Sequence, residues 1–283
     1  MPELPEVETL AGGLRASLVG RTIVAVDVRW EGCLSPPDPA AFSGRLAGQT
    51  VDAVGRRGKW LVMTLSSGQA MLIHLRMTGQ LLLSDESLAD ECHVRAVFSL
   101  DDGRRLVFAD MRKFGRICLL DDPEIILSRL GPEPLSSEFT AARLKAMLST
   151  RRGRIKPLLL NQRFLAGLGN IYADEALWRA RIHPFRRADE FTEDEIRRLH
   201  RAMRAVLRAA IARGGTTLSD GTYRRVDGEA GAYAAQLAAY GRAGEPCPRC
   251  GTSIERVKLG GRGTHFCPAC QPLEQRQIER LFY

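Results

Sequence analysis

The chain has 283 residues, of which 45% are apolar, and carries a formal net charge of +8. This length is too great for one small domain and suits two or three domains with real cores. No run of 18 apolar residues occurs, so the sequence predicts no transmembrane helix. Carboxylates occupy the start, where a signal peptide would be basic and then apolar, so we expect a cytosolic protein.

The N-terminal segment places a proline at position 2 beside two carboxylates, Glu3 and Glu6. Met1 precedes a small residue and is expected to be removed, which leaves Pro2 as a secondary α-amine. An α-amine has a pKa of about 8 against roughly 10.4 for lysine, so more of it is unprotonated and nucleophilic at neutral pH. Such amines form Schiff bases with carbonyl-like carbons. In the simpler reading, Pro5 only begins a helix and Pro2 precedes it.

The part of the chain after the first helix predicts strands. A helix over residues 5–20 is followed by short apolar segments at hairpin spacing, with turn signals and no helices between them. This arrangement favours an antiparallel β-sandwich or a flattened barrel. The expected strands are Thr22–Val28, Lys59–Leu65, Ala70–Leu75, Val94–Leu100, Arg105–Ala109 and Gly115–Leu120.

Beyond a Gly-Pro-Glu-Pro boundary at 131–134, the pattern becomes helical and basic. The segment from Arg143 to Arg213 holds 17 Lys or Arg and seven Asp or Glu. Such an excess is typical of a surface that binds a polyanion, although a well-solvated helical surface explains it equally well. Thr192 and Glu195 form a capping box that predicts a helix start.

A glycine-rich segment in this half precedes another helix. Gly167 and Gly169 lead to Asn170, which is a good N-cap for a helix over 171–181. The free N–H groups at such a start favour a phosphate. A tight turn between two helices is the alternative, and the segment taken alone favours it.

Four cysteines form two pairs near the C-terminus. Cys247 and Cys250 are followed, after sixteen residues, by Cys267 and Cys270, which is the spacing of a four-cysteine zinc site. Since all four ligands come from the protein, the metal is expected to be structural. A disulfide is the alternative, which a cytosolic setting disfavours. The glycine-rich and basic hairpin tip at 258–262 suits phosphate binding, unless it is only a flexible turn.

Six segments form a pattern that spans the chain: Pro2–Thr9, Gly55–Lys59, His74–Gly79, Asp110–Gly115, Gly167–Tyr172 and Gly241–Gln271. Together they resemble the formamidopyrimidine-DNA glycosylase family of bacterial base-excision repair. The resemblance implies an α+β multidomain fold. Its expected parts are an antiparallel β-sandwich with an N-terminal helix (2–131), a helix–two-turn–helix domain (135–241), a C-terminal four-cysteine zinc-finger hairpin (242–272) and a tail (273–283).

The resemblance also implies a function. The protein would be a monomeric, nucleoid-associated glycosylase and lyase that excises 8-oxoguanine and formamidopyrimidines from double-stranded DNA, with one structural Zn²⁺. Pro2 would attack C1′ of the flipped nucleotide, with Glu3 as general acid and Glu6 as a positioning group. The imine would lead to β-elimination, assisted by Lys59, and then to δ-elimination. The family assigns the second elimination to Arg262, but the pKa of arginine makes phosphate clamping the safer role.

A glycosylase must take the damaged base out of the stack, and side chains that fill the gap offset the cost of unstacking. The resemblance assigns this task to Met77, Arg112 and Phe114, whereas Met77 and Phe114 are by sequence alone more typical of a core. A loop over 216–228 is implied to cover the flipped purine. The other implied DNA contacts are His74, His93, Lys113, Arg152, Lys156, Asn170 and Tyr172.

Two other functions remain open. An endonuclease VIII-like glycosylase for oxidised pyrimidines would share Pro2. The endonuclease VIII branch of the family, however, usually has Gly in place of Leu4 and lacks gap-filling side chains of the kind that the resemblance implies at Arg112–Phe114. A non-enzymatic zinc-finger protein that only senses lesions would bind DNA without forming a Schiff base. An assay of 8-oxoguanine against thymine glycol separates the first function, and borohydride trapping separates the second.

Overall fold

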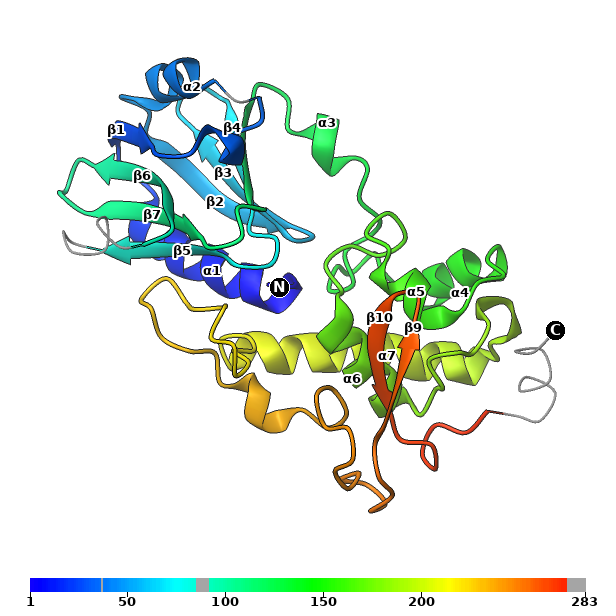
Figure 1. Ribbon diagram of the computed structural model, residues 1–283. Coiled ribbons are helices and arrows are strands. Elements are labelled where there is room, and N and C mark those ends of the chain that lie inside the picture. The colour runs from blue at the N-terminus through cyan, green and yellow to red at the C-terminus, as the bar shows by residue number, and fades with distance from the viewer. Residues whose placement is uncertain (37, 85–91, 274–283) are drawn as a thin grey trace. The chain divides into compact units, whose positions relative to one another are not determined.

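The residues that the computed structural model describes are 1–36, 38–84 and 92–273 (Figure 1). The chain divides into two compact units. The first unit comprises Met1–Arg129 and Ala210–Ala234, and the second comprises Leu130–Ala209 and the chain from Ala235 onward. The expected C-terminal tail lies outside the described residues, apart from Leu273. In the described ranges, no helix combines the length and apolar character that a bilayer crossing needs.

The first unit begins with helix α1, Leu4–Leu18. Glu3 is the N-cap residue, and its backbone N–H donates to the Glu6 carboxylate at 2.8 Å as part of a capping box. Pro5 lies in the first turn, where a helix needs no backbone donor. The helix predicted from the sequence is confirmed, and its buried residues include Val7, Leu10, Leu14 and Leu18, which recur at helical spacing on one face.

Two four-stranded antiparallel sheets follow, in the orders β1-β6-β7-β5 and β2-β3-β4-β8 (Figure 1). Their buried faces share one hydrophobic core with α1 and α2, which confirms the predicted sandwich. The elements are β1 Ile23–Val28, α2 Pro39–Leu46, β2 Val51–Arg57, β3 Trp60–Leu65, β4 Ala70–His74, β5 Gly79–Ser84, β6 Val94–Leu100, β7 Arg105–Asp110, β8 Arg116–Leu120 and the short α3 Glu124–Leu127.

The strands differ in how clearly the sequence predicts them. In β3, burial alternates, with Leu61, Met63 and Leu65 directed into the core, as expected for a half-buried strand. Strands β2 and β5 are not among the predicted strands. Gly55 lies within β2 and Gly79 begins β5, and glycine weakens the strand signal of both segments.

The segment Ala210–Ala234 returns to the first unit after the helical part of the chain. Tyr223 and Val226 are buried in the core of the sandwich, and Leu83 N donates to Val226 O at 3.1 Å, beside β5. The loop implied to cover a flipped base is therefore packed on the sandwich through these two side chains.

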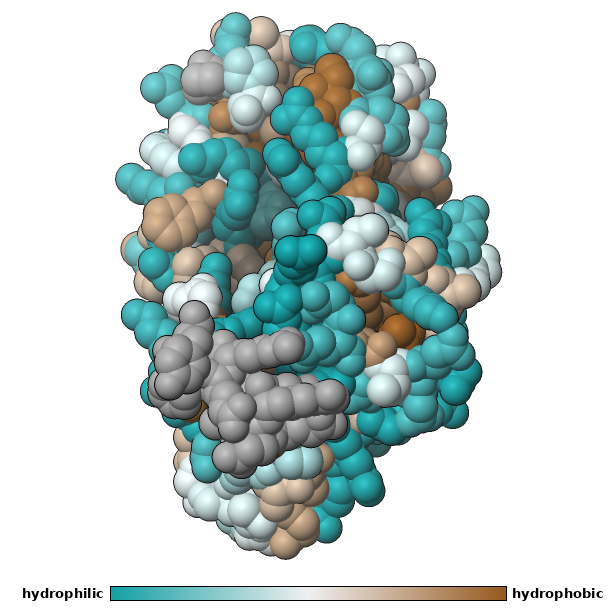
Figure 2. All heavy atoms as spheres, turned by 90° about the vertical axis from the view of Figure 1, so that its right-hand side faces the viewer, coloured by the Kyte–Doolittle hydropathy of each residue, from teal (hydrophilic) through white to brown (hydrophobic). Residues whose placement is uncertain are grey.

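The second unit is helical, with a separate two-stranded hairpin. The capping box predicted at Thr192 and Glu195 is confirmed by the two reciprocal hydrogen bonds, at 2.8 and 3.2 Å. The β-sandwich of the first unit and the helices of the second confirm the predicted α+β fold class. On the face of the molecule that Figure 2 shows, hydrophilic side chains predominate over smaller apolar areas. The elements are α4 Ala141–Ser149, α5 Ile155–Leu160, α6 Asn170–Ala180, α7 Glu193–Ala212, β9 Glu255–Leu259 and β10 Arg262–Phe266.

Candidate active site and metal centre

The start of α1 is buried, and the Glu6 carboxylate accepts hydrogen bonds there from two segments of the chain. Pro2 is buried, as are Glu3 and Glu6, which are 2% and 1% exposed. Besides its bond to Glu3 N, Glu6 accepts a hydrogen bond from Thr216 N at 2.8 Å. Gly215 allows this close approach, because a Cβ there would lie 3.0 Å from the Glu6 Oε1 atom, and its φ is +82°. Glu6 therefore fixes the helix start against the returning segment.

Lys59 lies in the tight turn between β2 and β3 and is only 5% exposed. Arg56 connects this turn to α1: its Nε atom lies 2.9 Å from a Glu8 carboxylate oxygen, and its Nη1 donates to Gly58 O at 3.0 Å. Neither Arg56 nor Glu8 is a site residue by the sequence analysis. Both lie in the segments that carry the resemblance, but nothing in the sequence shows that the two segments meet.

His74 ends β4 and lies against Trp60 of β3, with ring centroids 4.9 Å apart. Burial, together with the positive charges of Arg76 and Lys59, lowers the pKa of His74 to about 3. The imidazole is therefore neutral at pH 7. Its Nδ1 accepts a hydrogen bond from Arg76 N at 3.1 Å, so a contact of His74 with DNA would use a neutral ring.

Met77, Arg112 and Phe114 form one exposed cluster, which we call the wedge. Arg112 Nη1 lies 3.3 Å from the Met77 sulfur, and its guanidinium carbon is 4.9 Å from the centre of the Phe114 ring. Met77 is 37% exposed and Phe114 is 46% exposed. The alternative that these two side chains belong to the core is therefore wrong. Lys113, which lies between Arg112 and Phe114, is also exposed, as is His93, whose backbone carbonyl accepts a hydrogen bond from Asp110 N.

Lys156 requires a correction. The resemblance implies that it contacts DNA, but its side chain is 0% exposed. Its ammonium lies 2.6 Å from Asp174 Oδ1 and donates to Gly263 O at 2.9 Å and to Thr264 Oγ1 at 2.8 Å. Because these three groups enclose the ammonium inside the protein, Lys156 joins α5, α6 and β10 and does not reach a phosphate.

Replacing Lys156 by Met is expected to lower the free energy of unfolding of the second unit by about 3–5 kcal/mol, because Asp174 then stays buried without its counter-ion. Denaturant unfolding followed by Trp178 fluorescence measures this loss. Arg152→Met is the matched control, since Arg152 is exposed and a surface substitution changes stability by about 0.5 kcal/mol or less. Equal losses in the two variants would contradict the structural role of Lys156.

Two further expectations in this unit change. Tyr172 is 0% exposed, so its side chain is a core residue and not a surface contact. Gly169, and not Asn170, is the N-cap of α6. The Asn170 side chain instead donates to Gly263 O at 3.1 Å, so it supports the residue that follows Arg262. Arg262 itself is exposed at the start of β10, next to two glycines with positive φ in the hairpin turn.

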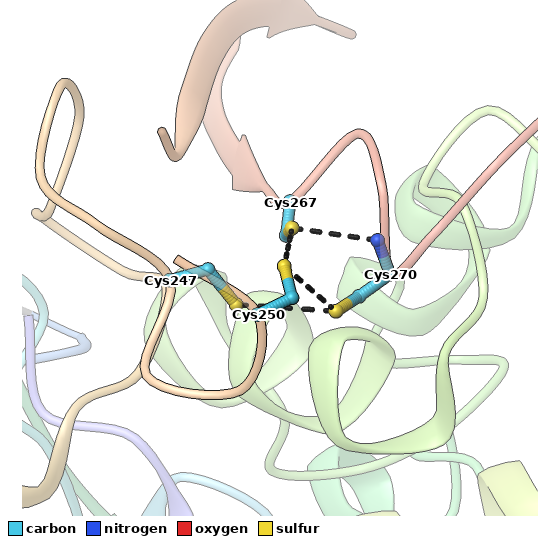
Figure 3. A group of neighbouring side chains, drawn as sticks. All are labelled: Cys247, Cys250, Cys267 and Cys270. Atoms are coloured by element: carbon cyan, nitrogen blue, oxygen red, sulfur yellow. Dashed lines mark hydrogen bonds between the residues drawn. The ribbon is translucent and has the colours of Figure 1, made fainter. Parts of the chain in front are cut away.

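The four predicted cysteine ligands converge on one point (Figure 3). All four sulfurs lie within 4.8 Å of one another, and three of the pairs are 3.4, 3.5 and 4.0 Å apart. Four sulfurs at 2.3 Å around a tetrahedral ion would be about 3.8 Å apart. The cluster therefore fits a single tetrahedral metal ion, and the expectation of a structural metal is supported.

Neighbouring groups also suit thiolate ligands at this cluster. Trp178 Nε1 of α6 donates to the Cys247 sulfur at 3.4 Å, a contact typical of the surroundings of metal-bound sulfur. Hydrogen bonds from Thr252 lower the pKa of Cys250 to about 6, whereas burial raises the pKa of Cys267. Ionising all four thiols in so small a volume needs a compensating cation.

A β-sandwich with a buried N-terminal proline, a basic helical unit and a four-cysteine hairpin define a class of DNA-repair glycosylases. Three family models match the chain in order: the formamidopyrimidine-DNA glycosylase N-terminal domain at residues 1–117, the H2TH domain of that glycosylase at 130–222, and the zinc finger found in FPG and IleRS at 244–273. The chain belongs to the formamidopyrimidine-DNA glycosylase family, a family of enzymes, as the resemblance implied.

Relatives cover almost the whole chain. The formamidopyrimidine-DNA glycosylase of Chloroflexus aggregans is 49% identical over 278 residues, which are 97% of this chain and 100% of that protein. The crystal structure of MutM (FPG) from Thermus thermophilus matches with a TM-score of 0.87 at 44% identity, covering 96% of this chain and 100% of that one. Lactococcus lactis Fpg, in complex with DNA that contains an abasic site, matches at 0.88 and 34% identity with the same coverage.

Proposed function

We propose that this chain is a bifunctional glycosylase and lyase that removes oxidised purines from double-stranded DNA. The observation that carries the proposal is the wedge. Two apolar side chains, Met77 and Phe114, are exposed next to the Arg112 guanidinium. Apolar side chains that are exposed together mark a contact surface, whereas single exposed ones do not. They suit insertion into a base stack, with the guanidinium bonded to the base left without its partner.

The same unit supplies the groups for the chemistry. After loss of Met1, the Pro2 amine attacks C1′ of the extruded nucleotide, and the bond from C1′ to the base breaks. The nitrogen and C1′ then form an iminium on the opened sugar. Glu3 is 2% exposed, and this shielding from bulk water suits a carboxyl that passes a proton to the sugar oxygen or to the leaving base. Glu6 holds the start of the helix that follows both residues.

Strand cleavage then follows from the iminium, which acidifies the protons at C2′. Lys59 assists this β-elimination as acid and base, and its turn is held on α1 through Arg56. Arg262 clamps a phosphate during the second elimination and does not donate a proton, because its pKa is too high. The proposed phosphate contacts are His93, Lys113, Arg152, Asn170 and Arg262, with His74 as a neutral contact.

The cysteine cluster would hold Zn²⁺, which stabilises the hairpin that carries Arg262 and takes no part in the reaction. The protein would act as a monomer on chromosomal DNA in the bacterial cytoplasm. Its functional division would be a catalytic domain over 2–131, a DNA-binding domain over 135–241 and a finger over 242–272. Binding would weaken steeply with salt and depend little on sequence away from the lesion.

A single-turnover assay on two duplexes tests the proposed substrate. We expect excision of 8-oxoguanine opposite cytosine at least about tenfold faster than excision of thymine glycol, because a site shaped for one base discriminates by at least about 1.4 kcal/mol. Faster excision of thymine glycol would support the endonuclease VIII-like alternative. Tight binding to both duplexes with no excision and no borohydride cross-link would support a lesion sensor and contradict the proposal.

A further inference from the structure

The wedge is built from two loops that are far apart in the chain. Met77 lies in the turn between β4 and β5, and Arg112 and Phe114 lie in the turn between β7 and β8. The strands next to these turns are paired, with Gly79 opposite Asp110. The two loops therefore start from neighbouring points on one sheet, and their relative position depends on what joins them there.

One buried hydrogen bond makes that join. Thr78, which follows Met77 directly, is 8% exposed, and Asp110, the last residue of β7, is 1% exposed. Thr78 Oγ1 donates to Asp110 Oδ1 at 2.5 Å. The same hydroxyl accepts a hydrogen bond from Arg112 N at 3.1 Å. The Thr78 side chain thus contacts both loops. Thr78 follows Met77 directly in the first loop, and its hydroxyl is hydrogen-bonded to the backbone of Arg112 in the second.

The Asp110 carboxylate closes the second loop at both ends. Its Oδ1 also lies 3.2 Å from Arg112 N, and its Oδ2 accepts a hydrogen bond from Gly115 N at 2.7 Å. A side chain at position 115 would collide with this arrangement, because a Cβ there would lie 2.5 Å from the Phe108 ring. The loop from 111 to 115 can therefore close over the carboxylate only with glycine at its end.

The carbonyl side of this loop has its own anchor. Arg116 Nη1 donates to Gly115 O at 2.8 Å and lies 3.4 Å from Phe114 O. Charged donors and acceptors of this kind form the stronger hydrogen bonds in proteins. Backbone N–H groups bonded to Asp110 and carbonyls bonded to Arg116 together fix the exposed loop on both of its edges.

We propose that Thr78, Asp110 and Arg116 are positioning residues that hold the wedge in its inserting geometry before DNA is bound. This inference rests on the proposed function of the wedge. Three side chains from two loops must enter one gap together, and any freedom between the loops would have to be lost at the moment of insertion. The buried bonds remove that freedom in advance. They touch no reacting atom, so their contribution should appear only where a base pair has to be opened.

Thr78→Val tests the proposal, because valine has nearly the shape of threonine but neither donates to Asp110 nor accepts from Arg112. Single-turnover excision is measured on two duplexes, one with 8-oxoguanine opposite cytosine and one with 8-oxoguanine opposite an abasic site, where no base pair has to be opened. We expect a loss of about tenfold or more on the paired duplex and less than about twofold on the other. Thr78→Ser, which keeps the hydroxyl, should restore the paired rate.

The controls separate the possible failures. Thr22→Val removes a half-buried hydroxyl that is hydrogen-bonded to Thr50, away from the wedge, and is expected to leave both rates unchanged. If Thr78→Val does not fold, Arg116→Met should give the same loss restricted to the paired duplex. An equal loss on both duplexes, or no loss on either, would overturn the positioning role. Failure of the unaltered protein to excise from either duplex would instead contradict the proposed function.

Discussion

Inserting one lysine between Met1 and Pro2 is expected to abolish the borohydride cross-link to DNA and to lower excision by at least about 10³-fold. The lysine prevents removal of Met1, so the Pro2 nitrogen stays in an amide bond and has no lone pair for attack. Met1 is 41% exposed, and an added residue before Pro2 therefore meets solvent and not the core. The variant should still fold and still bind a duplex with an abasic-site analogue.

A lysine inserted at Ser67 is the matched control. Ser67 lies in an exposed turn of the same unit, so this variant carries the same extra charge but leaves Pro2 free to react. It should cross-link like the unaltered protein. Mass spectrometry of the cross-linked peptide should place the sugar remnant on a peptide that begins at Pro2. A cross-link that persists in the variant extended before Pro2 and maps to Lys59, and not to Met1 or the inserted lysine, would show that another amine is the nucleophile.

The parts of the site that the sequence predicts well are those whose chemistry is local. Two pairs of cysteines at fixed spacing define a metal site wherever the rest of the chain goes, and the structure brings all four sulfurs together. The same holds for the start of α1, where Pro5, Glu3 and Glu6 are sufficient to set the helix and its capping box. Neither feature depends on a partner far away in the chain.

Burial of polar side chains was not predictable in this way. Lys156 and Tyr172 occur in motifs that carry the resemblance or lie near them, but a hydropathy pattern does not show that a lysine is enclosed by Asp174 and by a hairpin 108 residues further on. Met77 and Phe114 are the opposite case, because apolar residues are usually buried. Met77 and Phe114 are exposed because they lie in loops on the surface of the first unit.

Contacts between distant segments account for the remaining differences. The Thr78–Asp110 hydrogen bond spans 32 residues, and the Arg56–Glu8 pair spans 48. Strand register decides the first contact, and the packing of α1 on β2 decides the second. Register in turn depends on turns and on the burial pattern of several strands together. Because the sequence predicts neither β2 nor β5, it does not place Arg56 or Thr78 next to their partners.

Removing the metal from the cysteine cluster is expected to lower DNA affinity by at least about 100-fold while the first unit stays folded. The apolar residues packed at the cluster are few, with Ile254 and Trp178 beside the cysteines, and so small a core does not order a hairpin by itself. A structural zinc ion contributes about 10–16 kcal/mol in comparable fingers. The sandwich has its own large core and should not respond.

Trp178 makes this experiment specific. Its indole N–H is bonded to the Cys247 sulfur, so chelation should change its fluorescence, whereas Trp30 and Trp60 of the first unit should report no change. Trp178→Phe should remove the fluorescence response, which identifies its source. Added Zn²⁺ should restore both fluorescence and DNA binding. Full affinity in protein shown by metal analysis to be free of zinc would mean that the hairpin is dispensable for binding.

The buried ion pair connects this result to the rest of the second unit. Lys156 donates to Gly263 and Thr264 of β10, and Asp174 accepts from His265 N of the same strand at 2.9 Å. When the hairpin loses its metal and unfolds, these two charges lose the strand that covers them. Metal binding and the ion pair should therefore be coupled, and Lys156→Met is expected to weaken zinc binding about tenfold or more. An unchanged zinc affinity in that variant would show that the hairpin folds around its metal independently of α5 and α6.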